Sequence, residues 1–157
     1  MIQINQKTFT TQDGYDIIVL TPTGRLDITT AWQFRLKLQE CISKLSHHVV
    51  VNLGQVNFID SSGLTSLVAG MRDADKVKGS FRICNIHPEA NLVFEVTMMD
   101  TVFEIFDTEE EALESKVQEA SEPHGRWVEQ YLMRGFMQGF NRYGSFVNTT
   151  ETSQEDL

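Results

Sequence analysis

The most informative segment of the chain reads Asn57-Phe58-Ile59-Asp60-Ser61-Ser62-Gly63-Leu64-Thr65-Ser66-Leu67. A strand-like apolar segment ends here in small hydroxyl residues, a pattern that is typical of a helix start. The unpaired backbone N–H groups and the positive dipole of a helix N-terminus tolerate a phosphoryl group on Ser61. Such a group adds roughly −1.5 to −2 charges at pH 7. Placed beside Asp60, it would be a switch that a partner protein can read.

The same residues also have a purely structural interpretation. Asp60, Ser61 or Ser62 can each cap the helix by accepting hydrogen bonds from its first-turn N–H groups, and Gly63 can allow close helix packing. Spacing alone favours the cap. The sequence contains no Gly-x-Ser-x-Gly elbow and no glycine-rich phosphate loop. Ser61 therefore has no visible base or oxyanion hole, and we interpret it as a substrate of another enzyme, with no catalytic residue in the chain.

Several segments resemble the STAS family, the anti-sigma factor antagonists. The centre of the resemblance is Val49-Val50-Val51-Asn52-Leu53 followed by residues 56–64, and Gly24-Arg25-Leu26-Asp27 resembles the family's Gly-x-Leu-Asp turn. Segments that resemble the family's later strands and helix extend the likeness over roughly residues 10 to 118: 79–88, 92–97 and 102–106. In this family the first serine after the aspartate is phosphorylated. The resemblance therefore implies phosphorylation of Ser61, with Ser62 as the alternative acceptor.

The resemblance also implies a set of partner-binding residues. Asp27 and Asp60 are expected beside Ser61, where they would serve recognition of a partner or kinase. The remaining members lie on the same helix and at the start of a neighbouring loop: Ser62, Gly63, Thr65 and Asn85. Thr65 stands where many family members carry glycine, so a partner would approach this helix face less closely.

The function that the resemblance implies is that of a non-enzymatic regulatory protein of a partner-switching pathway. The unphosphorylated form would bind a serine kinase that also acts as an anti-sigma factor, phosphorylation of Ser61 would release it, and a phosphatase would reset the cycle. No cofactor is expected. One alternative is a structural subunit that assembles into a homo-oligomer. Another is a small-ligand role, because the family's fold also occurs in transport-linked and lipid-handling systems, although no polar cluster in the sequence favours a pocket.

Composition limits the classes of partner. The chain has 157 residues, of which 41% are hydrophobic, enough for one domain with a core and an appendage. Its 13 basic and 22 acidic residues give a net charge of −9, which argues against direct nucleic-acid binding. No apolar stretch approaches the roughly 20 residues of a membrane-spanning helix, and no signal-peptide pattern is visible. We therefore expect a cytoplasmic protein without a membrane span.

The cysteines and histidines indicate no metal site. Cys41 and Cys84 lie outside any Cys-x-x-Cys spacing, so buried free thiols are expected. The histidines do not fall at metal-ligand spacing, which favours surface or loop positions for them: His47, His48, His87 and His124.

Strands that alternate with helices predict an α/β fold, a STAS-like mixed sheet with packed helices. Strands are expected near residues 2–4, 16–20, 49–53, 81–86 and 102–106, with the first two antiparallel. Helices are expected from Thr29 or Thr30 to about residue 45 and over 62–78, 89–97 and 108–120. The apolar positions of the first helix, which include Trp32 and Leu36, are expected to form one buried face.

Three parts of the chain are predicted. Residues 1–120 form the STAS domain, residues 121–147 a linker and an aromatic-rich amphipathic helix, and residues 148–157 a disordered acidic tail. The helix, over about residues 126–143, carries an apolar stripe at mostly i, i+4 spacing that must be buried on something. Docking on the same chain or in a homodimer is favoured over a partner groove. Binding to a membrane surface is not favoured, because the segment has only three arginines.

Overall fold

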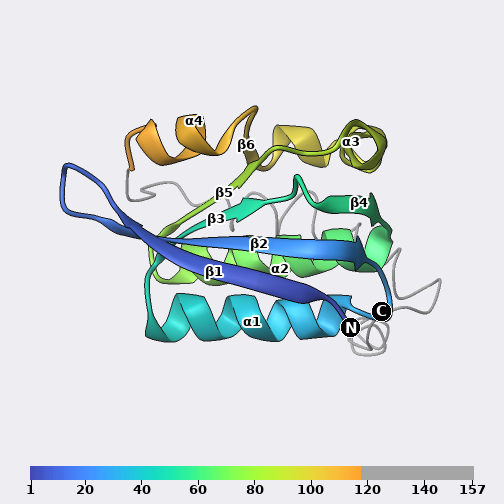
Figure 1. Ribbon diagram of the computed structural model, residues 1–157, viewed down its shortest axis with the longest axis horizontal. Helices are drawn as coiled ribbons and strands as arrows, with labels where there is room; N and C mark the ends of the chain where they lie inside the picture. The colour runs from blue at the N-terminus through green and yellow to red at the C-terminus, as the bar shows by residue number, and fades with distance from the viewer. Residues whose placement is uncertain (118–157) are drawn as a thin grey trace, which may run out of the picture.

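The computed structural model describes residues 1–117, which form a mixed six-stranded sheet with helices on both faces (Figure 1). The strands are β1 (Gln3–Thr10), β2 (Asp16–Leu26), β3 (His48–Asn52), β4 (Val56–Ile59), β5 (Ser80–Cys84) and β6 (Glu104–Phe106). The helices are α1 (Ala31–Lys44), α2 (Ser61–Lys76), α3 (Pro88–Val96), the 3-10 turn η1 (Met99–Thr101) and α4 (Glu109–Glu114). The predicted α/β fold is confirmed.

The strand order is β1-β2-β3-β5-β6, and β4 pairs with the far end of β2. β1 and β2 pair antiparallel, as predicted, and the other pairs are parallel. A right-handed crossover through a helix is the usual way to connect parallel neighbours, and α1 and α2 supply the connecting segments from β2 to β3 and from β4 to β5. The carboxyl ends of β2 and β4 therefore lie side by side.

The main core fills the space between the sheet and helices α1 and α2. Strand residues such as Leu20, Val51 and Ile83 are fully buried there against Phe34 of α1 and Leu67 of α2. The near-continuous apolar run in β3 fits this central position, because a parallel strand covered on both faces needs apolar side chains on both.

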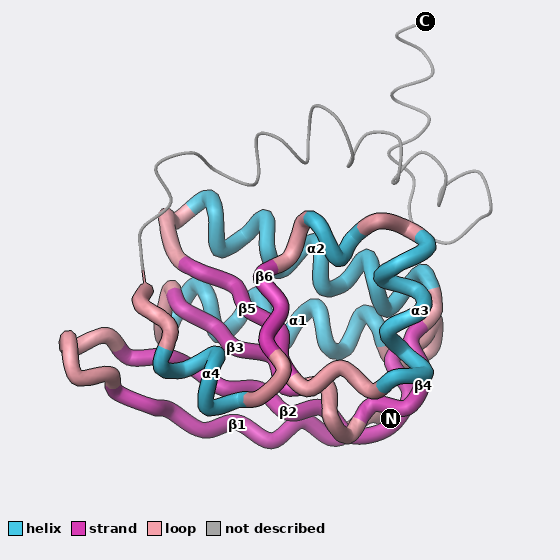
Figure 2. The backbone as a smooth tube through the Cα atoms, turned by 90° about the horizontal axis from the view of Figure 1, so that it is seen from above, coloured by secondary structure: helices cyan, strands magenta, loops and turns pink. Residues whose placement is uncertain are grey.

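The opposite face of the sheet carries α4, a helix of six residues. A small second cluster joins Ala112, Leu113 and Val117 to Val19 and Val50 of the sheet. Figure 2 shows β1 at the outer edge of the sheet, beyond α4. This face is therefore only partly covered by the described residues.

Polar contacts hold α4 at both ends. At its start, the Glu109 carboxylate accepts hydrogen bonds from Lys7 Nζ and Asn52 Nδ2, each at 2.8 Å. At its end, the buried Arg82 guanidinium donates to the carbonyls of Ala112 at 2.7 Å, Ser115 at 2.8 Å and Lys116 at 2.6 Å. A guanidinium that donates to three backbone carbonyls fixes the position of this helix end.

Several predicted elements have different bounds in the structure, and the first two strands are longer than expected, ending at Thr10 and Leu26. The helix expected over 108–120 ends at Glu114, because Ser115 is extended. The Arg82 guanidinium donates hydrogen bonds to backbone carbonyls at this end of the helix. Its predicted start is correct, since the Thr108 hydroxyl caps the Glu111 N–H at 3.2 Å. The strand expected over 102–106 begins at Glu104, after η1 and two buried residues.

Three side-chain predictions are corrected. Trp32 and Leu36 are 65% and 51% exposed because, four residues apart, they share the outer side of α1, whereas Phe34 and Leu38 face the core. His48 is buried at the start of β3, where its Nδ1 lies 3.0 Å from Ser80 Oγ. Thr30 stands at the N-cap position of α1, but its hydroxyl donates to the Arg25 carbonyl at 2.8 Å and makes no cap.

Both cysteines of the sequence are buried free thiols, as predicted. Burial raises the pKa of Cys84 to about 12 and also raises that of Cys41. Since the thiolate is the reactive form, the Cys84 thiol stays protonated and is unreactive at neutral pH.

The predicted linker, the helix over 126–143 with its homodimer contact, and the acidic tail lie outside the described residues. Within residues 1–117, none of the helices is long and apolar enough to cross a bilayer.

Candidate functional site

Ser61 is the first residue of α2 and is exposed at the end of β4. The helix is capped by Asp60, whose Oδ1 accepts hydrogen bonds from the N–H groups of Ser62 at 2.8 Å and Gly63 at 3.0 Å. The three candidate caps are thereby resolved in favour of Asp60. The Ser61 side chain is not needed to hold the helix and stands at its positive end.

Asp60 also ties α2 to the loop that follows β2. Its Oδ2 accepts a hydrogen bond from the Ile28 N–H at 3.1 Å, and its own N–H donates to the Leu26 carbonyl at 3.2 Å. With three backbone N–H groups on its carboxylate, Asp60 has most of its roughly four acceptor positions occupied. It is a structural anchor of the site and not a free general base for Ser61.

Asp27 lies in the same place because of strand register. Leu26 of β2 is paired with Ile59 of parallel β4, so the residues that follow them, Asp27 and Asp60, leave the sheet together. The Asp27 Oδ1 accepts hydrogen bonds from the Thr29 hydroxyl at 2.7 Å and the Thr29 N–H at 3.0 Å. The Thr29 hydroxyl is the main cause that holds the pKa of Asp27 below its ordinary value, and Arg25 adds to it.

Gly63 allows α2 to approach β2 closely. A Cβ built on this glycine would lie 2.1 Å from the Leu26 carbonyl oxygen, so any side chain would force the helix away. Ser62 and Thr65 are also buried, and the Thr65 hydroxyl donates to the Ser61 carbonyl at 2.8 Å. These three residues lie beneath Ser61 and support it. Partner contact through them stays a prediction. Because they are buried, they would influence a partner by setting the position of the helix.

Asn85 lies apart from this group. It follows β5 with a positive φ of 57°, its N–H donates to the Phe106 carbonyl at 3.2 Å, and its Cβ packs beside Gly54. The contacts described for residues 1–117 do not join it to Asp27 or Asp60. Its expected role in partner binding stays a prediction.

One feature of the site was missed in the sequence. The Arg25 guanidinium stacks on the Phe58 ring, with its carbon 4.0 Å from the ring centroid, and its Nε lies 3.3 Å from Asp27 Oδ2. This contact follows from the pairing of Arg25 with Phe58 between β2 and β4. Only the strand register could have revealed it. Ile28, which is 60% exposed, adds apolar surface beside the two carboxylates.

The arrangement offers an acceptor and a recognition surface. An exposed hydroxyl stands at a helix N-terminus next to the Asp60 cap, and Asp27 leaves the sheet at the same end. No group of three histidine, cysteine, aspartate or glutamate side chains within the described range is placed to hold a metal ion.

Comparison with known proteins gives several relatives that are anti-sigma factor antagonists. The chain is 24% identical over 98 residues to the anti-sigma F factor antagonist of Paenibacillus polymyxa, a match that covers 62% of this chain and 84% of that protein. An anti-sigma-factor antagonist (STAS) domain protein from Planctomyces limnophilus has the same fold, with a TM-score of 0.58 at 24% identity over 69% of this chain and 94% of that one.

A third relative is the cell fate determinant SpoIIAA from Bacillus, whose structure was solved in the phosphorylated form. It matches with a TM-score of 0.54 and 26% identity, covering 70% of this chain and 96% of that one. The family model of the STAS domain matches residues 8–112, which is well over half of the chain. The chain therefore belongs to the STAS domain family.

Proposed function

We propose that the protein is an anti-sigma factor antagonist of a cytoplasmic partner-switching pathway. Its unphosphorylated form binds a serine kinase that is also an anti-sigma factor, phosphorylation of Ser61 releases it, and a phosphatase restores it. The observation that carries this proposal is the division of labour at the start of α2, where Asp60 caps the helix and leaves Ser61 exposed. The serine can be modified without loss of the cap.

The relatives support the same role. The matching protein of Paenibacillus polymyxa is an anti-sigma F factor antagonist, and the matching SpoIIAA of Bacillus has a phosphorylated form. Both comparisons extend over the segment that contains the strands and helices around Ser61, and they favour a regulatory protein over an enzyme.

The geometry gives a physical reason for release. A phosphoryl dianion on Ser61 is tolerated within the free protein, because it lies at the positive end of α2 and in water. In a packed interface the same dianion must be desolvated and lies near Asp27 and Asp60. Arg25, the cation on this edge that contacts Asp27, is already engaged by that carboxylate and by the Phe58 ring. Modification therefore weakens binding while the fold persists.

The first test is intact-mass spectrometry with site mapping on protein recovered from the cells that naturally make it, under two growth conditions. A phosphoryl group on Ser61 whose occupancy changes with the condition supports the switch. Persistent absence of the group in both conditions would contradict it.

A second test measures which proteins the variants capture from the same cells. Ser61→Ala should retain a kinase of the anti-sigma type, whereas Ser61→Asp should bind it about tenfold or more weakly, because like charges at an interface are strongly unfavourable. Ser62→Ala tests the alternative acceptor, and it should leave the effect of Ser61 on capture in place, since the Ser62 hydroxyl is buried. Equal capture by Ser61→Ala and Ser61→Asp would refute the role of Ser61.

A further inference from the structure

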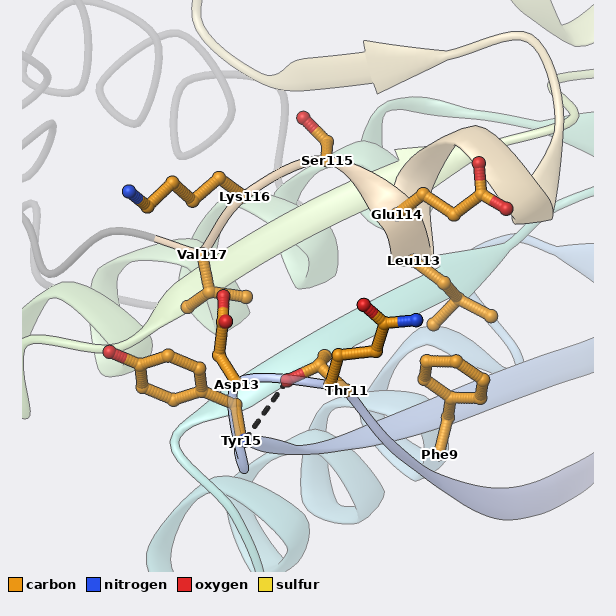
Figure 3. A pocket seen from close by; sticks show the side chains of 10 residues that line it. Phe9, Thr11, Asp13, Tyr15, Leu113, Glu114, Ser115, Lys116 and Val117 are labelled. Atoms are coloured by element: carbon orange, nitrogen blue, oxygen red, sulfur yellow. Dashed lines mark hydrogen bonds between the residues drawn. The ribbon is translucent and has the colours of Figure 1, made fainter.

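A pocket of about 350 Å³ opens between the β1–β2 hairpin and the last described residues. Figure 3 shows Phe9 and Tyr15 of the hairpin facing Leu113 and Val117 across it. In Figure 1 the hairpin extends from the end of the sheet opposite β4. The pocket is therefore remote from Ser61, and an inference about it is independent of the proposed function.

We propose that this pocket is the docking site of the chain's own segment 126–143, with Trp127 as its first anchor. Val117, the last described residue, itself lines the pocket, so the rest of the chain departs from the pocket wall. Trp127 follows ten residues later, and ten residues of flexible chain span about 16–19 Å on average. A connection this short gives an effective concentration of about a millimolar, so that even weak docking is well populated.

The pocket lining combines six polar residues with four that carry apolar surface, and it is this second group that can receive apolar side chains of the segment. The segment carries a stripe of large side chains at mostly helical spacing, in which the aromatic members are Trp127, Tyr131, Phe136, Phe140 and Tyr143. Each large aromatic side chain gains from burial of about 150–250 Å². The pocket presents two aromatic rings and two aliphatic side chains, and Phe9 is still 39% exposed on the edge strand β1.

The charge around the pocket is mostly opposite to that of the segment, with Asp13 and Glu114 lining it beside one base, Lys116. Segment 126–143 contains Arg126, Arg134 and Arg142 against the single acid Glu129. The helix beside the pocket, α4, is acidic, and several of the carboxylates on and next to it are exposed: Asp107, Glu110, Glu111 and Glu114. A cationic segment is attracted to this acidic end of the domain.

Both walls of the pocket are held in place before anything docks. The Arg82 guanidinium fixes the carbonyls of Ala112, Ser115 and Lys116 on one side. On the other side the Tyr15 N–H donates to the Thr11 hydroxyl at 3.0 Å, and the Tyr15 ring stacks edge-on against His48. A preformed site saves the ordering cost that a flexible one would add to binding.

The test uses the full chain with Trp32→Phe, which leaves Trp127 as the only tryptophan of the two in the sequence. Trp32 is 65% exposed on α1, so its replacement should leave the fold intact. We expect Trp127 emission at a shorter wavelength than that of a solvated indole, protection from acrylamide quenching, and a monomer by light scattering. Phe9→Glu should shift the emission to longer wavelength and abolish the protection.

Two further variants make the test specific. Glu114→Lys reverses a charge beside the pocket on an exposed residue and should also reduce the protection, more so at low salt. Leu92→Glu is the control, because it places a new carboxylate on an exposed apolar position of α3, which lies away from the hairpin (Figure 1). It should leave Trp127 emission unchanged.

Four outcomes would overturn the proposal. Trp127 of the full chain could emit as a solvated indole, or its protection could survive Phe9→Glu in a variant with unchanged circular dichroism. Protection that rises with protein concentration together with the mass would assign the stripe to a second copy. Protection that arises only with vesicles of anionic lipid would assign it to a membrane surface.

Discussion

The two faces of the sheet are stabilised in different ways. On the face of α1 and α2, a continuous core buries large side chains such as Leu38, Leu67 and Ile83. On the other face, α4 buries Ala112 and Leu113 and is held at its ends by charged groups from distant strands. A helix this short is marginal by itself. Directional polar contacts can therefore position an element whose buried apolar area is too small to do so.

Matched leucine substitutions on the two faces should give the largest difference in stability. Leu67→Ala should lower the free energy of unfolding by about 3–5 kcal/mol, since it opens a cavity at a fully buried position, whereas Leu113→Ala should cost about 2 kcal/mol or less in the small cluster. Urea denaturation of the full chain measures both values. Equal losses would mean that both faces depend on apolar burial to the same extent.

Arg82 tests the polar side of the comparison. Arg82→Met should cost about 2–3 kcal/mol, because three backbone carbonyls, one of them buried and two partly buried, lose a charged donor. Hydrogen exchange should locate the loss at the amides of α4, with α1 and α2 little affected. Arg82→Lys keeps the charge without the planar fork, so it should recover only part of the loss. Uniformly faster exchange in all helices would show that Arg82 supports the whole fold.

The smallest effect concerns acid sensitivity. Burial alone would raise the pKa of Glu109, but hydrogen bonds from Lys7 and Asn52 outweigh it, and the pKa lies below its ordinary value of 4.5. The stability that the Glu109 carboxylate contributes is therefore present above that value and is lost as pH falls through the lower, folded pKa.

Thermal unfolding between pH 7 and pH 3 checks this expectation. The difference in melting temperature between the natural chain and Glu109→Gln should shrink as the pH falls below 4.5. Glu111→Gln, which removes the same charge from an exposed position of α4, is the control. A difference that does not change with pH would show that the hydrogen bonds of Glu109 do not depend on its charge.

Sequence patterns predicted those parts of the fold that apolar periodicity determines. The apolar run at residues 49–53 predicted a covered strand, and the change from Ile59 to the serines placed the start of α2 within one residue. The end of α4 could not be predicted, because it depends on Arg82, a residue some 30 positions earlier in the chain. Trp32 was misplaced because its apolar neighbours in α1 occupy more than one side of the helix.

The candidate site was predicted in part. Asp27, Asp60 and Ser61 came from the family resemblance, and the register of β2 with β4 supplies the physical reason that they meet. The stacking of Arg25 on Phe58 depends on the same register and left no signal in either local segment. The burial of Ser62 and Thr65 follows from how closely Gly63 lets α2 approach Leu26, a distance that spacing alone does not contain.

The Asp60 anchor has a consequence for how Ser61 can be recognised. Because one carboxylate binds the first turn of α2 and the Ile28 N–H together, the serine is presented on a fixed three-dimensional epitope built from two loops. An enzyme that acts on it meets a helix start and cannot draw the segment into an extended cleft without breaking those bonds. A synthetic peptide of residues 55–67 would carry every neighbouring residue of the linear motif and still be a poor substrate.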